Sequence, residues 1–138
     1  MRQNPSRHWA MLVIATLLVA CGRTPVPAGY DFITHSLPTG PTMTALLEGT
    51  LAISGGPTNG STCLLVVRGS LDVTLVAWPE RFRLVLGNDG KVEVHGDGKV
   101  FRQGEEVRLG GGETSSGVRH SISGACQGSY YFAAESFP

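Results

Sequence analysis

The sequence predicts an all-β fold, built as a small barrel or a sandwich. From residue 42 onward, short apolar runs alternate with turn residues, and no stretch keeps the 3.6-residue apolar repeat of an amphipathic helix. Glycine makes up 19 of the 138 residues, about twice its usual share. Glycines between apolar runs are typical of the tight turns that connect strands.

Seven or so short strands are expected. The first covers residues 47–53, where alternate positions share one apolar face: Leu47, Gly49, Leu51 and Ile53. Residues 63–67 are apolar at consecutive positions, as in a strand buried on both faces. A third strand over 71–78 ends at Pro79, which lacks a ladder donor. Further strands are expected at 82–86, 91–95, 99–102, 106–109 and 130–133, with hairpin turns at Asp89-Gly90 and Asp97-Gly98.

The first twenty residues have the features of an export signal. Arg2 and Arg7 give a positive start, and the run from Trp9 to Ala20 carries no charge. This run is too short for an ordinary membrane-spanning helix, although a retained span is the alternative. We therefore expect residues 1–20 to be a signal peptide that is removed from the mature chain.

Leu18, Val19, Ala20 and Cys21 directly follow this apolar run. They resemble the lipobox of bacterial lipoproteins. The resemblance implies cleavage before Cys21, acylation of its thiol and anchoring of the chain in a membrane of the cell envelope. Gly22, in place of an aspartate after the cysteine, implies the outer membrane, facing the periplasm, in a host with two membranes. The alternative is an ordinary signal peptide that ends near a cysteine.

The segment that follows the cysteine is expected to be a flexible tether. Residues 21–41 are rich in proline and glycine, which stiffen or interrupt the chain. Tyr30, Phe32 and Ile33 are the apolar residues of this tether that could dock on the domain. The β-barrel domain is then expected over residues 42–138.

Charge and cysteine content restrict the function. Without Arg2 and Arg7, nine basic and eleven acidic residues remain, so the net charge is −2 and no basic stripe for nucleic acid is present. Cys63 and Cys126 are expected to form a disulfide, because exported proteins meet an oxidising environment. A metal or catalytic thiol is the alternative, but the CxxC spacing that would favour it is missing.

No catalytic residue, metal site or cofactor is predicted. Three histidines lie beyond the signal peptide: His35 in the tether, His95 in a strand and His120 in a polar loop. Ser115, Ser116 and Ser121 lie near His120 in the sequence, but no nucleophile elbow of the Gly-x-Ser-x-Gly kind is present. The glycines of 110–112 lack the following helix start and Lys-Ser/Thr pair of a phosphate cradle. Asn88, Asp89 and Asp97 do not have the spacing of an EF-hand calcium loop. A small periplasmic hydrolase that uses His120 or His95 remains the alternative function.

The first candidate for a binding surface is Trp78 with Arg81, Phe82 and Arg83, because a cation beside aromatic rings could stack a sugar or a base. Strand alternation places both arginines on one face and Phe82 on the other. The alternative is that the arginines form a solvated face and Trp78 belongs to the core.

Residues 103–112 look like the strand-turn-strand segment of small OB-like barrels. Together with Gly49-Thr50-Leu51, Cys63-Leu64 and Trp78-Pro79, they resemble uncharacterised small envelope lipoproteins, a family without a known activity. The expected function is therefore a lipid-anchored binding or structural module without catalysis, whose partner is an envelope protein or glycan. An OB-like domain that binds oligosaccharide or peptide is the second alternative.

Overall fold

The computed structural model describes residues 25–38, 44–54, 61–70 and 72–138, and the signal peptide and Cys21 lie outside these ranges. The described residues form strands and contain no helix, so the all-β prediction is confirmed. No described helix is long and apolar enough to cross a membrane. The strands are β1 Tyr30–Asp31, β2 Ile33–His35, β3 Ala45–Ser54, β4 Thr62–Arg68, β5 Asp72–Pro79, β6 Arg83–Leu86, β7 Val92–Gly96, β8 Lys99–Arg102, β9 Glu106–Thr114, β10 Val118–His120 and β11 Tyr131–Ser136.

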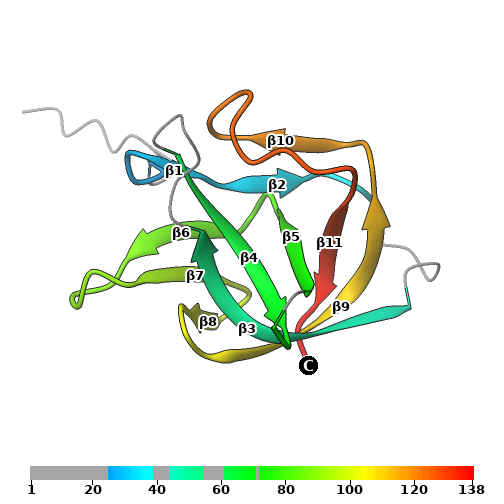
Figure 1. The fold of residues 1–138 in the computed structure, drawn as a ribbon, viewed down its shortest axis with the longest axis horizontal. Helices are drawn as coiled ribbons and strands as arrows, with labels where there is room; N and C mark the ends of the chain where they lie inside the picture. The colour runs from blue at the N-terminus through cyan, green and yellow to red at the C-terminus, as the bar shows by residue number, and fades with distance from the viewer. Residues whose placement is uncertain (1–24, 39–43, 55–60, 71) are drawn as a thin grey trace, which may run out of the picture.

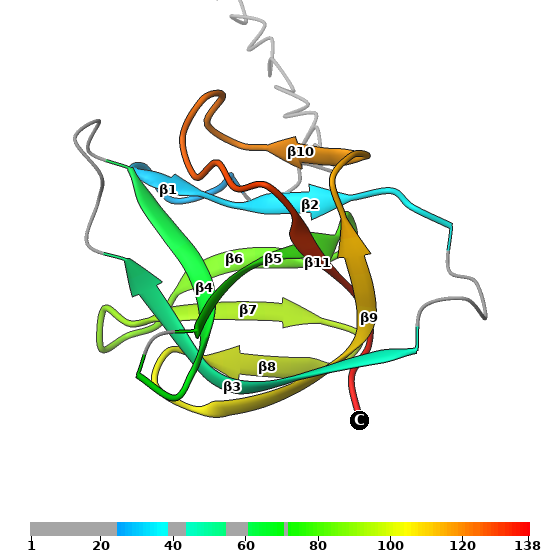
Figure 2. The same ribbon diagram turned by 45° about the vertical axis from the view of Figure 1, so that its right-hand side comes forward.

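Eight strands form one mixed sheet in the order β1-β4-β3-β9-β11-β5-β2-β10, and β4 also pairs with β5. The pairs β3–β4, β3–β9, β9–β11 and β4–β5 are antiparallel, whereas β11–β5 is parallel. Each of these five strands therefore pairs with two others of the set, and they curve around a shared interior (Figures 1 and 2). Side chains from all five strands enter the main hydrophobic cluster.

The second sheet has three strands in the order β6-β7-β8. Its two hairpins turn at the expected positions, where Gly90 and Gly98 have positive φ values of 76° and 73°. Val92 and Val94 are fully buried on the inner face of β7, and they join the core cluster. This sheet therefore contributes to the same core as the strands of the larger sheet.

The glycines of 110–112 lie inside β9, which runs to Thr114 instead of ending at residue 109 as expected. A Cβ atom added at Gly111 would collide with the backbone carbonyl of Ala133 in β11. At Gly110 it would collide with the side chain of Ser136. These glycines therefore let β9 and β11 approach closely, as glycine does where two backbones meet.

Part of the expected tether belongs to the folded domain, which is a correction to the boundary at residue 42. Tyr30–Asp31 pair with β4 as β1, and Ile33–His35 pair with both β5 and β10 as β2. Phe32 and Ile33 are buried, in agreement with the expectation that they dock on the domain. Short strands such as these form because a neighbouring strand offers backbone groups at its edge. The proline and glycine content of residues 21–41 therefore did not predict them.

The disulfide between Cys63 and Cys126 is present, with 5.6 Å between the two Cα atoms. It joins β4 to the segment that precedes β11, and it lies in a second hydrophobic cluster with Ile33, Ala77 and Tyr131. The crosslink therefore fixes the long connection between β10 and β11 against the larger sheet.

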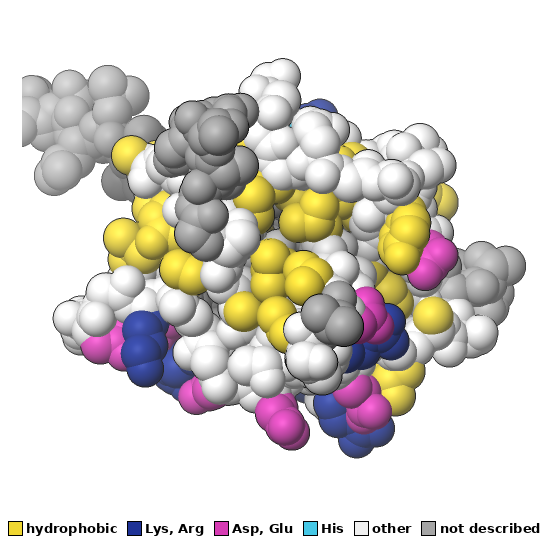
Figure 3. All heavy atoms as spheres, in the orientation of Figure 1, with side chains coloured by type: hydrophobic (Ala, Val, Ile, Leu, Met, Phe, Trp, Pro, Cys, Tyr) yellow, Lys and Arg dark blue, Asp and Glu magenta, His cyan; other side chains and the backbone are white. Residues whose placement is uncertain are grey.

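The outer face of β3, β4 and β5 is also apolar. Ala52, Leu65 and Leu75 lie side by side across these strands, and Val73 near the start of β5 is 56% exposed. Figure 3 shows apolar side chains gathered over β4 and β5, with charged side chains along the lower rim. This face is separate from the pocket described next.

Candidate functional site

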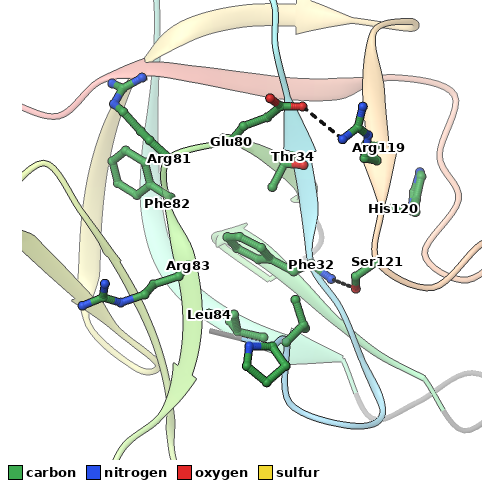
Figure 4. A pocket seen from close by; sticks show the side chains of 12 residues that line it. Phe32, Thr34, Glu80, Arg81, Phe82, Arg83, Leu84, Arg119, His120 and Ser121 are labelled. Atoms are coloured by element: carbon green, nitrogen blue, oxygen red, sulfur yellow. Dashed lines mark hydrogen bonds and ion pairs between the residues drawn. The ribbon is translucent and has the colours of Figure 1, made fainter. Parts of the chain in front are cut away.

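A pocket of about 730 Å³ lies between β2 and β10 on one side and the β5–β6 turn with β6 on the other (Figure 4). Its apolar lining comes from Pro25, Val26, Phe32, Phe82 and Leu84. Its polar lining comes from Thr34, Glu80, Arg81, Arg83, Arg119, His120 and Ser121. The strand register explains two members of this set, because Thr34 pairs with Arg119 and the two side chains therefore share a face of the β2–β10 pair.

Two of the three arginines of the pocket have an acidic partner. Arg81 makes two hydrogen bonds to the carboxylate of Asp97, at 2.7 and 2.6 Å, and its guanidinium carbon lies 5.5 Å from the ring centroid of Phe82. This hydrogen bonding lowers the pKa of Asp97 and raises the pKa of Arg81. Arg119 lies 3.5 Å from Glu80 across the pocket. Arg83 is exposed and makes no ion pair within the described part of the chain, so its charge is available to a ligand.

Trp78 does not line the pocket. It is fully buried in the core, where its ring centroid lies 5.3 to 6.1 Å from those of Phe82, Phe101 and Phe137. The alternative placement of Trp78 in the core is therefore the one observed, and a fully buried ring presents no face to a ligand. Of the four residues proposed for binding, Arg81, Phe82 and Arg83 line the pocket, with Phe82 on the inner side as alternation requires.

His120 lies in β10 and not in a loop, and it belongs to a buried polar network. Its Nδ1 is 2.6 Å from a carboxylate oxygen of Asp31, a residue with no exposed surface. Its Nε2 is 3.2 Å from the hydroxyl of Tyr131. The backbone N–H of Ile122 donates to the other oxygen of Asp31 at 3.1 Å. The network therefore ties the segment after β10 to β1, two parts of the chain about ninety residues apart.

Ser121 does not complete a Ser-His-Asp arrangement with this pair. Its hydroxyl accepts a hydrogen bond from the backbone N–H of Phe32 at 2.7 Å and donates to the carbonyl of Tyr30 at 3.0 Å. Both ring nitrogens of His120 already have partners. A general base needs a free nitrogen within reach of the proton it removes, so this geometry favours a structural role for His120.

The other two histidines lie away from the pocket lining. His95 pairs with Glu93 on the β7 strand at 2.7 Å, and this hydrogen bond, followed by that from Arg102, lowers the pKa of Glu93. His35 is buried, and its Nε2 lies 2.8 Å from the carbonyl oxygen of Ala134. Among the described residues, no group of three or more histidine, cysteine or acidic side chains is placed to hold a metal.

Sequence reasoning missed Asp31, Glu80 and Arg119, which contribute to the pocket or to its support. Arg119 and Glu80 meet across a pairing that no local pattern reveals. For Asp31, the apolar neighbours on both sides were the available signal, because a lone acid within an apolar stretch suggests a buried, hydrogen-bonded carboxylate.

No family model, curated protein or solved structure matches this chain.

Proposed function

We propose that the chain is an envelope lipoprotein, anchored through lipid on Cys21, whose domain binds an anionic envelope component in the pocket between β2, β6 and β10. The observation that supports this most directly is the lining of the pocket. Arg81, Arg83 and Arg119 line it beside apolar residues such as Val26, and Arg83 has no ion pair among the described residues. Apolar walls with a few convergent polar groups are the usual composition of a ligand site.

The ring of pairings among β3, β4, β5, β9 and β11 supports a closed five-stranded barrel as the scaffold. A five-stranded barrel is the size of an OB fold, a fold that presents one face to oligosaccharides and other extended ligands. We propose a rigid barrel that carries the site at its rim, because a rigid scaffold keeps a small set of charged side chains in place.

Binding without catalysis is favoured over hydrolysis by the hydrogen bonds around His120. Its two nitrogens are engaged by Asp31 and Tyr131, and the hydroxyl of Ser121 is engaged by backbone groups. The purified protein is therefore expected to release no product from generic ester, peptide and glycoside substrates. Turnover that is lost in a folded His120→Ala variant would support the hydrolase instead.

Acylation is tested by mass spectrometry of the protein from the membrane fraction. The expected result is an N-terminal peptide that begins at Cys21 and carries acyl chains, since two or more chains give stable anchoring. A Cys21→Ser variant should lose this modification. Membrane protein that lacks acyl groups at Cys21 would contradict the proposed anchor.

Binding is tested by purifying the protein from crosslinked envelopes and analysing the captured lipid, glycan and protein. Arg81→Ala with Arg83→Ala should reduce the captured anionic component, whereas Arg108→Ala should not, because Arg108 pairs with Glu48 on β3 outside the pocket. Each substitution should change stability by only about 0.5 kcal/mol, as is usual for exposed charges. Equal capture by all variants would place the binding site elsewhere.

A further inference from the structure

The described chain is fixed to the domain very soon after the proposed anchor. Pro25 and Val26 line the pocket, and Val26 also packs against the main core. Four residue steps separate Cys21 from Pro25. Since one step spans at most about 3.6 Å, the Cα atom of Pro25 lies within about 14 Å of that of Cys21.

This reach places the pocket at the membrane whenever Cys21 is acylated. The flexible tether expected from the sequence ran to residue 41 and would have allowed the domain to move far from the bilayer. Because Val26 packs against the core, the chain between Cys21 and the pocket is too short to allow such a movement. The pocket of an acylated chain therefore stays close to the bilayer surface, where lipid head groups are concentrated.

The pocket is locally cationic although the mature chain is slightly acidic. Its lining contains three arginines and one glutamate, Glu80, and the carboxylate of Asp97 pairs with Arg81, so the charge of Arg83 is left unbalanced. Guanidinium groups present paired donors that match a phosphate, and they are favoured where phosphate is recognised. Arg83 on β6 and the weakly paired Arg119 on β10, which is 73% exposed, supply these donors, and Figure 4 shows the Arg83 side chain extending outward from β6.

We propose that this pocket docks on the anchoring membrane and binds the phosphate of an anionic lipid head group. The inference rests on the proposed acylation of Cys21. The guanidinium groups of Arg83 and Arg119 contact the phosphate, and Pro25 and Val26, the accessible apolar residues of the lining, contact the glycerol and the first carbons of the acyl chains. A membrane lipid is favoured over free phosphate because the short connection to Cys21 holds the pocket at a surface where lipid phosphates are concentrated.

The test is photo-crosslinking of the acylated protein in vesicles. One set of vesicles contains phosphatidylcholine with a phosphatidylglycerol probe that carries a photoreactive group in its head group. The other contains the same photoreactive group on phosphatidylcholine alone. Peptides that cover residues 80–84 and 119–121 should be labelled by the anionic probe at least fivefold more than by the neutral probe. Fivefold is the factor that corresponds to about 1 kcal/mol for one basic residue near an anionic membrane.

Arg83→Ala and Arg119→Ala should each reduce this labelling about fivefold, whereas the matched control Arg108→Ala should leave it unchanged. Equal labelling by both probes, or labelling that survives both pocket substitutions, would overturn the inference. Labelling of the same peptides by a soluble photoreactive glycerol phosphate, as strong as that by the lipid probe at the same total concentration, would show that the pocket takes a free phosphate ester and would also overturn docking on lipid.

Intact-mass measurement of the same sample separates this inference from the anchor on which it rests. Acylated protein that is not labelled at the pocket overturns the head-group site alone. Protein without acyl groups overturns the anchor and this inference together.

Discussion

Replacement of Asp31 by alanine is expected to destabilise the domain by about 3–5 kcal/mol, because the substitution breaks the buried network behind the pocket. The carboxylate has no exposed surface, and it lies 2.6 Å from His120 Nδ1 and 3.1 Å from the N–H of Ile122. A hydrogen bond to a charged group contributes about 1.5–3 kcal/mol, and both donors would be left without this partner. Such a loss is a large part of the 5–15 kcal/mol that keeps a typical domain folded.

Urea unfolding of the oxidised protein, followed by far-ultraviolet circular dichroism, measures this effect. With a slope of about 1.5 kcal/mol per molar, the midpoint should fall by about 2–3 M. Asp31→Asn should be milder, because its amide oxygen still accepts from Ile122. The control is Asp72→Ala, which removes an exposed ion pair with Arg68 and should cost about 1 kcal/mol or less. If Asp31→Ala costs no more than Asp72→Ala, the network does not stabilise the fold.

Three further predictions concern separate parts of the domain. Reduction of the Cys63–Cys126 disulfide, which closes a loop of 63 residues, should lower stability by about 4 kcal/mol, and thiol labelling of the denatured, unreduced protein should find neither sulfur free. Arg81→Ala should raise the pKa of Asp97 in a carboxylate NMR titration, because the guanidinium holds it below its usual value. The pair therefore stabilises the fold fully above the ordinary carboxyl pKa, and this stabilisation is lost as the pH falls through the lowered pKa of Asp97. If the free energy of unfolding of Arg81→Ala falls with acid in the same way as that of the original protein, the pair does not stabilise the fold. Gly111→Ala should lower the thermal midpoint by an amount equivalent to about 1–3 kcal/mol, since its methyl group collides with the backbone of β11, and an unchanged midpoint would show that β9 and β11 can separate freely.

The parts of the fold that have a local signature could be predicted from the sequence. Alternation in 47–53 predicted β3, although the strand is longer, and the Asp-Gly pairs at 89–90 and 97–98 predicted the two hairpins of the small sheet. The pairing of Cys63 with Cys126 followed from the cysteine count and the expected compartment. Each of these features depends on residues that are neighbours in the sequence or on a count of one residue type.

The parts that depend on distant partners could not be predicted. β1, β2 and β10 have two or three residues each, which is too few to show a period, and each exists because another strand offers an edge. β10 pairs with β2 through Val118 and His35, 83 positions apart. Polar contacts such as those of Asp31 with His120 then follow from this pairing. The sequence therefore predicted only one wall of the pocket, with Arg81, Phe82 and Arg83. The opposite wall comes from residues 25–34, which were expected to be tether, and from residues 119–121, which were expected to be loop.

The Asp31 network also sets the distance between the domain and the membrane, if Cys21 carries the anchor. It holds β1 in place, and β1 fixes the chain just after Val26. If residues as far as Phe32 separate from the domain, eleven residue steps follow Cys21 in place of four, and the possible reach grows from about 14 Å to about 40 Å. That distance is several times the length of about 8 Å over which charges are screened, so the arginines would lose the attraction of the lipid phosphates.

Asp31→Ala protein that remains folded at low temperature should therefore show weaker photo-crosslinking to anionic lipid at residues 80–84, although Arg83 and Arg119 are intact. Asp31→Asn should retain most of the labelling, because it keeps part of the network. The control is Asp72→Ala, which leaves β1 undisturbed. Full labelling of Asp31→Ala, at a temperature where circular dichroism shows the native strand signal, would mean that the short connection does not position the pocket.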